Sequence, residues 1–281
     1  MGFQWDWMRS RVSVPYLPTL GPLLPEAMSR ELLEDVFAVA GTGDFLPHDK
    51  DRRWSEHKNE WVLVDSVVQD RERTLIPTLT SRGILRLHLY GAPELLSEAQ
   101  ETAAKLAALH GAANARVVWF QEHPNGLVAS TRVQLRTFDS PVPAVNGIEM
   151  LSETPANVAM TFTAFSERMA GEGFAFLNSR LDAVGPVLVA AQNGQVAGAI
   201  GPMETMPDPI GRSRLLPQYF GVLPEYRGLG LGRRLWRAAM HWGRRHGADY
   251  QLLQTTAGGA SDRLCRSEGL VGLGFVCTSG V

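Results

Sequence analysis

Three glycines stand at alternate positions in one short stretch of the sequence, Gly228, Gly230 and Gly232. The apolar run 215–222 before them predicts a strand, and residues 230–246 carry apolar side chains at helical spacing, which predicts a helix. A glycine-rich turn between a strand and a helix aims successive backbone N–H groups and the positive helix end at one point. Such a point binds phosphate, because no side chain keeps the anion away from the backbone.

Two common phosphate motifs do not fit this stretch. No Lys-Ser or Lys-Thr pair follows the glycines, so it is not the mononucleotide P-loop. The dinucleotide fingerprint needs Gly-x-Gly-x-x-Gly, whereas the third glycine here comes two residues after the second. A plain tight turn before an amphipathic helix would need only one glycine. The stretch therefore indicates a different kind of phosphate site.

The stretch resembles the acyl-CoA signature of the GCN5-related N-acetyltransferases, the GNAT superfamily. Their pattern is Val-x-Pro-x-x-Arg-Gly-x-Gly-x-Gly/Ala, followed by a leucine-rich helix. Seven positions match it without a gap, namely Val222, Pro224, Arg227, Gly228, Gly230, Gly232 and Leu235. The resemblance covers about residues 147–281. It implies an α/β (α+β) fold, in which helices flank a mixed, mostly antiparallel sheet.

The resemblance also implies a chemistry, the direct transfer of an acyl group from acetyl-CoA or another acyl-CoA to an amine. Backbone N–H groups near Phe220, Gly221 and Val222 would polarise the thioester carbonyl, as an oxyanion hole does. The turn and the first helical residues would hold the pyrophosphate. These residues are Arg227, Gly228, Leu229, Gly230, Leu231, Gly232 and Arg233. No metal is expected.

The catalytic base is not given by the pattern. Family members often carry a glutamate on the strand before the signature, but residues 214–220 contain no acid. The nearest carboxylates along the chain are Glu204 and Asp208, and elimination favours Glu204 as the base. The alternative is that Glu204 is a carboxylate of a surface loop. Tyr219 is the second catalytic candidate, although it alternates with Gln218, so only one of the two faces the acceptor.

The general acid is missing or replaced. The family tyrosine that protonates the thiolate lies in the last helix, but no tyrosine follows Tyr250. An alignment on Gly269 puts Cys265 at that position, and an alignment on Phe275, the closer match, puts Leu270 there. Cys265 is interpreted as a buried helix residue rather than a nucleophile. Water can protonate the thiolate, so activity is still expected.

Composition predicts a globular protein with one large or two medium domains, since the 281 residues are 44% hydrophobic and 20% charged. The net charge of −2 gives no bulk attraction to nucleic acid or anionic membranes, although six arginines and no acid lie within 226–248. Two cysteines predict no disulfide framework. The N-terminus has no basic n-region and no apolar core, so it is not expected to be a signal peptide, and the uncharged stretch 183–203 is predicted to be a hairpin turning at Asn193-Gly194. A cytoplasmic location is expected.

A linker at 139–146 divides the predicted domains, 1–140 and 147–281. Pro93 opens a predicted helix that ends near residue 110, with strands before and after it. The N-terminal domain is either a degenerate copy of the same fold or an unrelated α/β cap. It has no second glycine signature, so no second acyl-CoA site is expected. Residues 17–25 are proline-rich and predict a surface arm.

The sequence thus predicts an acyl-CoA-dependent N-acyltransferase that acts on the amine of a small molecule, and specialised metabolism is the expected setting. Two alternatives stay open. In the first, aminoacyl-tRNA donates the acyl group, and the arginines and the missing tyrosine keep this alternative open. The second is a non-catalytic acyl-CoA sensor. No membrane partner is expected, and the protein is predicted to be a monomer or a homodimer.

Overall fold

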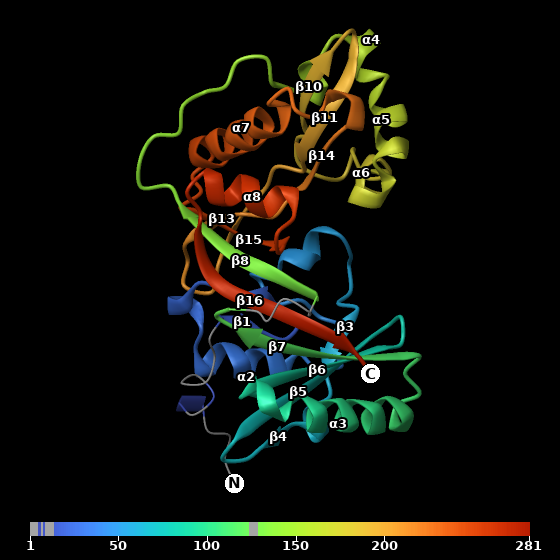
Figure 1. The fold of residues 1–281 in the computed structure, drawn as a ribbon, viewed down its shortest axis with the longest axis vertical. Helices are drawn as coiled ribbons and strands as arrows, with labels where there is room; N and C mark the ends of the chain where they lie inside the picture. Colours follow the sequence, from blue (N-terminus) through green and yellow to red (C-terminus); the bar gives the residue numbers. More distant parts are fainter. Residues whose placement is uncertain (1–4, 7, 9–13, 124–128) are drawn as a thin grey trace. The chain divides into compact units, whose positions relative to one another are not determined.

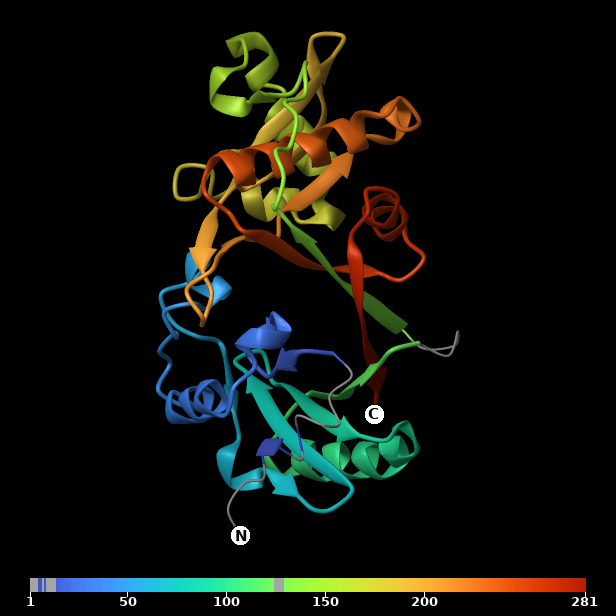
Figure 2. The same ribbon diagram turned by 90° about the vertical axis from the view of Figure 1, so that its left-hand side faces the viewer.

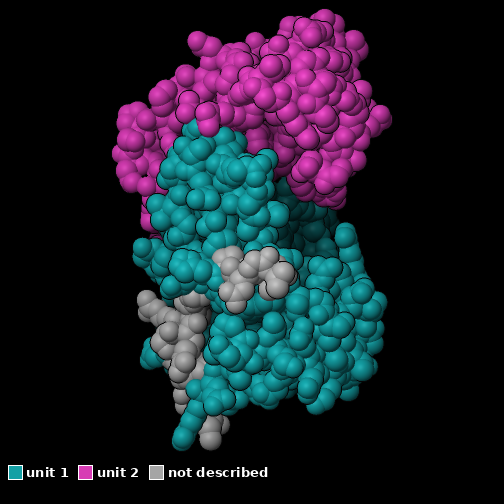
Figure 3. All heavy atoms as spheres, viewed as in Figure 1, with its two compact units in different colours: residues 1–135, 252–281 teal, residues 136–251 magenta. Residues whose placement is uncertain are grey.

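The computed structural model describes residues 5–6, 8, 14–123 and 129–281. The stretch 1–13, where no targeting signal is expected, lies mostly outside this range. The chain forms two compact units (Figure 3). Unit 1 contains residues 1–135 and 252–281, and unit 2 contains residues 136–251. The predicted linker 139–146 contains no helix or strand and lies at the start of unit 2.

Unit 2 is built on an antiparallel sheet of four strands in the order β14-β11-β10-β9. The strands are β9 (Glu149–Met150), β10 (Leu188–Gln192), β11 (Gln195–Gly201) and β14 (Tyr219–Val222). Asn193 and Gly194 connect β10 to β11 with φ angles of 50° and 76°. These angles fit a tight hairpin turn. The predicted hairpin within 183–203 is therefore confirmed.

Helices cover both faces of this sheet (Figure 1). One face carries α4 (Ala156–Ala159), α5 (Phe162–Arg168) and α6 (Phe174–Asn178), and the other carries α7 (Leu231–Arg245). Phe162, Phe165 and Phe174 pack against Val189 and Val196 of the sheet. A Cβ atom on Gly198 would lie 2.9 Å from Leu235 Cδ1. The lack of a side chain at this position therefore lets α7 approach β11 closely.

A second ladder of unit 2 consists of β12 (Thr205–Pro207), β13 (Ser213–Leu215) and the start of β15 (Tyr250–Thr256). The strands β12 and β13 form an antiparallel hairpin, and β13 runs parallel to Tyr250 and Gln251. The predicted single strand 215–222 is therefore wrong, because the chain is interrupted between β13 and β14. Pro217 lies in the interruption and has no N–H group for a ladder hydrogen bond.

Unit 1 contains a ladder in the order β8-β16-β7-β6-β5-β3, and β4 also pairs with β5. Its strands are β3 (Glu60–Val62), β4 (Val68–Gln69), β5 (Arg73–Thr80), β6 (Ile84–Gly91), β7 (Asn114–Gln121), β8 (Ala129–Thr137) and β16 (Val271–Gly280). The helix α3 (Leu96–Leu109) lies along one face of this sheet in both views (Figure 1, Figure 2). Ala99, Ala103 and Ala107 pack there against Leu87 and Trp119. The predicted helix after Pro93 is confirmed.

The N-terminal segment is part of the core of unit 1, so the predicted surface arm at 17–25 is wrong. Leu17 and Leu24 are 0% and 1% exposed. The Tyr16 ring stacks on His88, with 5.9 Å between the ring centroids. The segment includes β1 (Tyr16–Leu17), β2 (Gly21–Pro22) and then α2 (Arg30–Ala38). Its apolar residues bury the sheet face that α3 leaves uncovered.

The last strand, β16, lies between β7 and β8, where Val276 pairs with Phe120 on one side and Thr131 on the other. The helix α8 (Ala260–Ser267) precedes it. The compact units therefore differ from the predicted domains 1–140 and 147–281, because pairing with β7 and β8 holds residues 252–281 in unit 1. Both neighbours of β16 thus come from the N-terminal half of the chain.

The helices flanking mixed sheets confirm the predicted fold class. Within the described ranges, the helices are too short or too polar to cross a bilayer.

Candidate active site

The turn between β14 and α7 has its glycines where the backbone needs them. Gly228 and Gly230 adopt left-handed φ angles of 81° and 75°, which other L-residues rarely adopt. Open space adjoins both, since an added Cβ would meet no atom within 4 Å. Gly232 serves another purpose, because its Cβ would lie 3.2 Å from Phe220 Cζ. The three glycines thus shape the turn, expose its backbone and let α7 pack on β14.

The N-terminus of α7 is an open anion cradle. Its N-cap, Gly230, offers no side-chain hydrogen bond, and the first turn contains no acid. The first N–H groups of a helix have no partner within the helix and carry a partial positive charge. Gly228, Leu229 and Gly230 are exposed, so an anion can reach these groups from solvent.

Two arginines add positive charge to this cradle. The Arg227 Nε group donates to the Val222 carbonyl at 3.1 Å, which folds the exposed arginine back along β14. Arg233 is exposed in the first turn of α7. Leu231 is only 2% exposed and anchors the helix start in the core. The arrangement fits a diphosphate that receives backbone N–H bonds and guanidinium charge together.

Among the residues that the structure describes, β14 is the outer strand of its sheet and pairs with β11 on one side only. Within the described residues, β15 pairs elsewhere, since Tyr250 and Gln251 lie beside β13. The interruption at Pro217 causes this separation, because it moves the chain from one ladder to the other. At the interruption, Gln251 Nε2 donates to Gln218 Oε1 at 2.8 Å. An unpaired backbone edge therefore borders the glycine turn.

The side chains of β14 alternate between the two helix layers. Phe220 and Val222 face α7, because both lie within 4 Å of a Cβ atom on Gly232. Gly221 faces the other layer, where its Cβ would lie 2.6 Å from Met169 Cε. Tyr219 shares that side, and its ring centroid is 6.4 Å from both Phe174 and Phe176.

Glu204 and Tyr219 occur in neighbouring segments of unit 2. The Glu204 carbonyl accepts a hydrogen bond from the Leu216 N–H group at 2.9 Å, which extends the β12–β13 ladder. Tyr219 pairs with Gly201 in the β11–β14 ladder. Both residues are half-buried. They therefore lie where two chain segments pass from one ladder to the other, next to the start of β14.

The other nearby acids have structural partners. The Asp208 carboxylate accepts from Tyr250 Oη at 2.8 Å and from the backbone N–H groups of Ile210 and Arg212 at 3.0 and 2.8 Å. Burial and this hydrogen bond raise the pKa of Tyr250. The Asp249 carboxylate accepts from the Ser213 N–H group at 2.8 Å. These contacts give Asp208 and Asp249 structural roles, and the role of Glu204 as a base stays a prediction.

Cys265 lies on α8 in unit 1 and is 3% exposed. Burial raises the pKa of its thiol to about 11, and the nearby Asp262 adds to the effect. A thiol with this pKa stays protonated at neutral pH and is a poor nucleophile. Asp262 is fully buried and pairs with Arg132, with 2.7 Å between Oδ1 and Nε. The sequence did not indicate this pair, because its members lie on distant segments.

A clamp around the variable positions of the signature was also not predicted. Arg168 of α5 forms two hydrogen bonds with the Glu225 carboxylate, at 2.7 and 2.8 Å. Gln195 Nε2 donates to the Tyr226 hydroxyl at 2.8 Å. Both contacts hold the short 3-10 helix η7 (Pro224–Tyr226) just before the glycines. The only sequence signal was the opposite charge of Arg168 and Glu225, which lie far apart along the chain.

Further side chains of α7 are structural. Arg234 Nη2 donates to the Asn146 carbonyl at 2.5 Å, and His241 Nδ1 lies 2.6 Å from the Val142 carbonyl. These contacts hold the linker 139–146 along α7. The His246 ring stacks on Trp242, with 3.9 Å between centroids.

Residues 156–265 match the family model described as the acetyltransferase (GNAT) family. This range runs from α4 to α8 and includes the glycine turn. No curated protein matches the sequence.

Several solved structures are similar to this chain. A GCN5-related N-acetyltransferase from Sphaerobacter thermophilus is 16% identical over 78% of this chain and 84% of that one, with a TM-score of 0.46. A tandem GNAT protein from the clavulanic acid biosynthesis pathway is 16% identical, covering 88% and 92%, with a TM-score of 0.47. A GNAT-family acetyltransferase from Colwellia psychrerythraea is 13% identical, covering 90% and 97%, with a TM-score of 0.48. These similarities are too low to add an argument, and the assignment rests on residues 156–265.

Proposed function

The chain is a GNAT-family acetyltransferase through residues 156–265, and we propose that it transfers an acyl group from acyl-CoA directly to the amine of a small molecule. The observation that carries the proposal is the exposed turn with Gly228 and Gly230 in left-handed conformations before an uncapped α7. A turn of this kind fits the pyrophosphate of CoA. Acetyl-CoA is the expected donor.

The proposed donor site extends from the turn onto β14. Arg227 and Arg233 flank the backbone N–H groups of the turn and supply charge to the phosphates. The backbone edge of Phe220, Gly221 and Val222 would hold the arm of CoA and polarise the carbonyl, as the family resemblance implies. The bound acyl-CoA supplies a thioester carbonyl that an amine can attack.

Glu204 is proposed to remove the proton from the attacking amine. It is half-buried, and its carbonyl accepts a hydrogen bond from the Leu216 N–H group in the segment that leads to β14. Tyr219 is the second candidate, because its ring lies between β14 and the aromatic residues of α6. The leaving thiolate would take its proton from water, since Cys265 is a buried thiol with a raised pKa.

Acetyl-CoA consumption over a panel of small primary amines tests the proposal. Thiol release that depends on one class of amine, and that is lost in Gly230→Asp, is the expected result. Activity that needs aminoacyl-tRNA and disappears after ribonuclease treatment would instead support the tRNA-dependent alternative. Tight CoA binding without turnover on any amine would support the sensor alternative.

A further inference from the structure

A second candidate binding site lies in unit 1, in residues that the proposed acyl-transfer chemistry does not use. A groove of about 550 Å³ runs between the loop 45–60 and the adjoining ends of β5 and β6. This volume is within the range of about 300–1,000 Å³ that is usual for small-molecule sites. Aromatic side chains and cationic side chains both contribute to its lining.

One wall of the groove is fixed by an ion cluster around Lys58. The Lys58 ammonium donates to the Thr19 carbonyl and to Asp49 at 2.8 Å, and to Asp51 at 3.0 Å. Only 8% of the lysine side chain is exposed, and its three N–H bonds are all used. Asp51 also accepts from Lys50 at 2.9 Å, so each of its oxygens already has a cationic partner. This wall is therefore held in place before a ligand binds, and the negative charges of Asp49 and Asp51 are balanced by Lys50 and Lys58.

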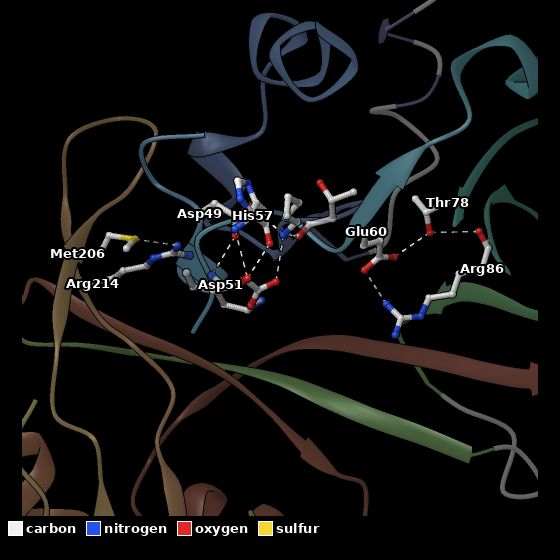
Figure 4. A network of polar contacts seen from close by, with 12 residues as sticks. Asp49, Asp51, His57, Glu60, Thr78, Arg86, Met206 and Arg214 are labelled. Carbon is white, nitrogen blue, oxygen red and sulfur yellow. Dashed lines mark hydrogen bonds and ion pairs between the residues drawn. The ribbon is translucent and has the colours of Figure 1, made fainter. Parts of the chain in front are cut away.

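Another part of the lining is held by Glu60, whose carboxylate contacts Thr78 and Arg86 (Figure 4). Glu60 Oε1 accepts from the Thr78 hydroxyl at 2.8 Å, and Oε2 accepts from Arg86 Nη1 at 2.7 Å. Both oxygens of this acid are thus occupied as well. The Arg86 side chain is 39% exposed, so its other N–H groups remain available to the groove.

The groups of the groove that are still available to a ligand are mainly hydrogen-bond donors. In the described part of the chain, the Arg82 side chain and the His57 ring are exposed, and neither has a hydrogen-bond or ion-pair partner. The lining also contains Trp54 and Phe45, over whose rings Arg53 and Lys58 lie at 4.6 and 5.7 Å. The groove therefore offers positive charge from Arg82 and Arg86 together with aromatic surface.

We propose that this groove binds a small organic anion, a carboxylate with a planar or apolar body. Arg82 and Arg86 bind the carboxylate, because a guanidinium matches the geometry of two carboxylate oxygens. Trp54, Phe45 and Ile84 contact the body, which accounts for the apolar part of the lining. The site is separate in sequence from the glycine turn, and it does not depend on the proposed acyl transfer.

Calorimetry of the full chain with benzoate tests the proposal. Benzoate should bind saturably, with a Kd of about millimolar size, as expected for a ligand with few atoms. Benzyl alcohol, which lacks the charge, and inorganic phosphate, which lacks the body, should each bind about tenfold or more weakly. Arg82→Ala should weaken benzoate binding about tenfold, because it removes one charge-assisted contact.

Two variants serve as controls. Arg266→Ala removes an exposed arginine of α8 in the same unit and should leave benzoate binding unchanged. Gly230→Asp, which alters the glycine turn, should also leave it unchanged. Because Arg82 is exposed in the turn between β5 and β6, its replacement should keep the fold, which a thermal melt checks. Absence of saturable benzoate binding, equal binding by Arg82→Ala, or equal losses in Arg82→Ala and Arg266→Ala would overturn the proposal.

Discussion

The two units contain the same strand–turn–helix–strand succession with opposite features at the turn. In unit 1, β6 leads through a turn to α3 and then to β7, and in unit 2, β14 leads to α7 and then to the start of β15. The strands β6 and β7 pair in parallel from Ile84 to Leu89, whereas β14 and β15 have other partners. Only the second succession leaves a backbone edge beside its turn. A shared topology therefore does not by itself make a binding site.

The N-terminal ends of α3 and α7 also differ. Before α3, Gly91 has no left-handed φ, and its Cβ would lie 3.0 Å from the Glu72 carbonyl oxygen, so this turn is closed. The first turn of α3 carries Glu98, which pairs with Arg73 at 2.5 Å. Arg73 lowers the pKa of Glu98, so the carboxylate stays charged and repels phosphate. The start of α7 has open glycines and no acid, which favours an anion.

The largest expected effect is on CoA affinity, which the same substitution should lower in one succession and leave unchanged in the other. Gly230→Asp places a negative charge in the phosphate site, where like charges cost several kcal/mol, so CoA affinity should fall at least about 100-fold. Gly111→Asp is the matched control, because Gly111 follows α3 with a φ of 62° and open space around it. Calorimetry with CoA should show an unchanged affinity there. Equal affinities in both variants would show that the glycine turn is not the site.

Replacing one glutamate in each unit tests whether the catalytic base also belongs to unit 2. Glu204→Gln keeps the size of the side chain and removes its basicity, so turnover at neutral pH should fall about 100-fold. The rate should recover partly at high pH, where the acceptor amine loses its proton unaided. Glu94→Gln, at the start of the turn before α3, should leave the pH–rate profile unchanged. An unchanged profile in Glu204→Gln would return that residue to a surface-loop role and favour Tyr219.

The clamp on η7 should have a smaller effect on affinity. Arg168 and Glu225 are 49% and 44% exposed, and solvent screens exposed ion pairs, so the pair contributes little. Arg168→Ala should therefore weaken CoA binding by up to about fivefold, by loosening the residues before the glycines. Arg73→Ala breaks the corresponding pair of unit 1 and should not change CoA affinity. A larger loss in Arg73→Ala than in Arg168→Ala would contradict the comparison.

The smallest effect concerns acid stability of unit 1. Burial raises the pKa of Asp51, but Lys50 and Lys58 outweigh it and lower the pKa from 3.8 to about 2. A lowered pKa stabilises the fold above the unfolded value, and the contribution is lost as pH falls from about 4 to about 2. Because 43% of the Asp51 side chain is exposed, the contribution is below about 1 kcal/mol. Denaturant unfolding should show wild type losing more stability than Asp51→Asn over this pH range, and parallel losses would refute the assignment.

The parts predicted from sequence are those encoded by local spacing. The seven matched positions located the glycine turn and α7, and Asn193-Gly194 located the β10–β11 hairpin, because each turn needs particular residues at fixed positions. Pro93, which opens the predicted helix, located the segment that contains α3. Local patterns of this kind act within a few residues, so they can be read without knowing the rest of the fold.

The parts that were missed depend on distant segments. The pairing of β16 with β7 and β8 holds residues 252–281 in unit 1, and nothing near Phe275 encodes its partners. Leu17 and Leu24 were assigned to a surface arm because prolines surround them, but a sheet formed by later residues buries them. The interruption at Pro217 was hidden within an apolar run. The roles of Glu204 and Tyr219 stay predictions, because neither depends on a recognisable spacing.

The number of CoA molecules bound per chain tests the central claim most directly. Isothermal titration of the full chain with CoA should give about one site, since only the β14–α7–β15 succession combines an open glycine turn with an unpaired strand edge. Two equivalent sites would contradict the account, because the closed turn before α3 would then bind CoA as well.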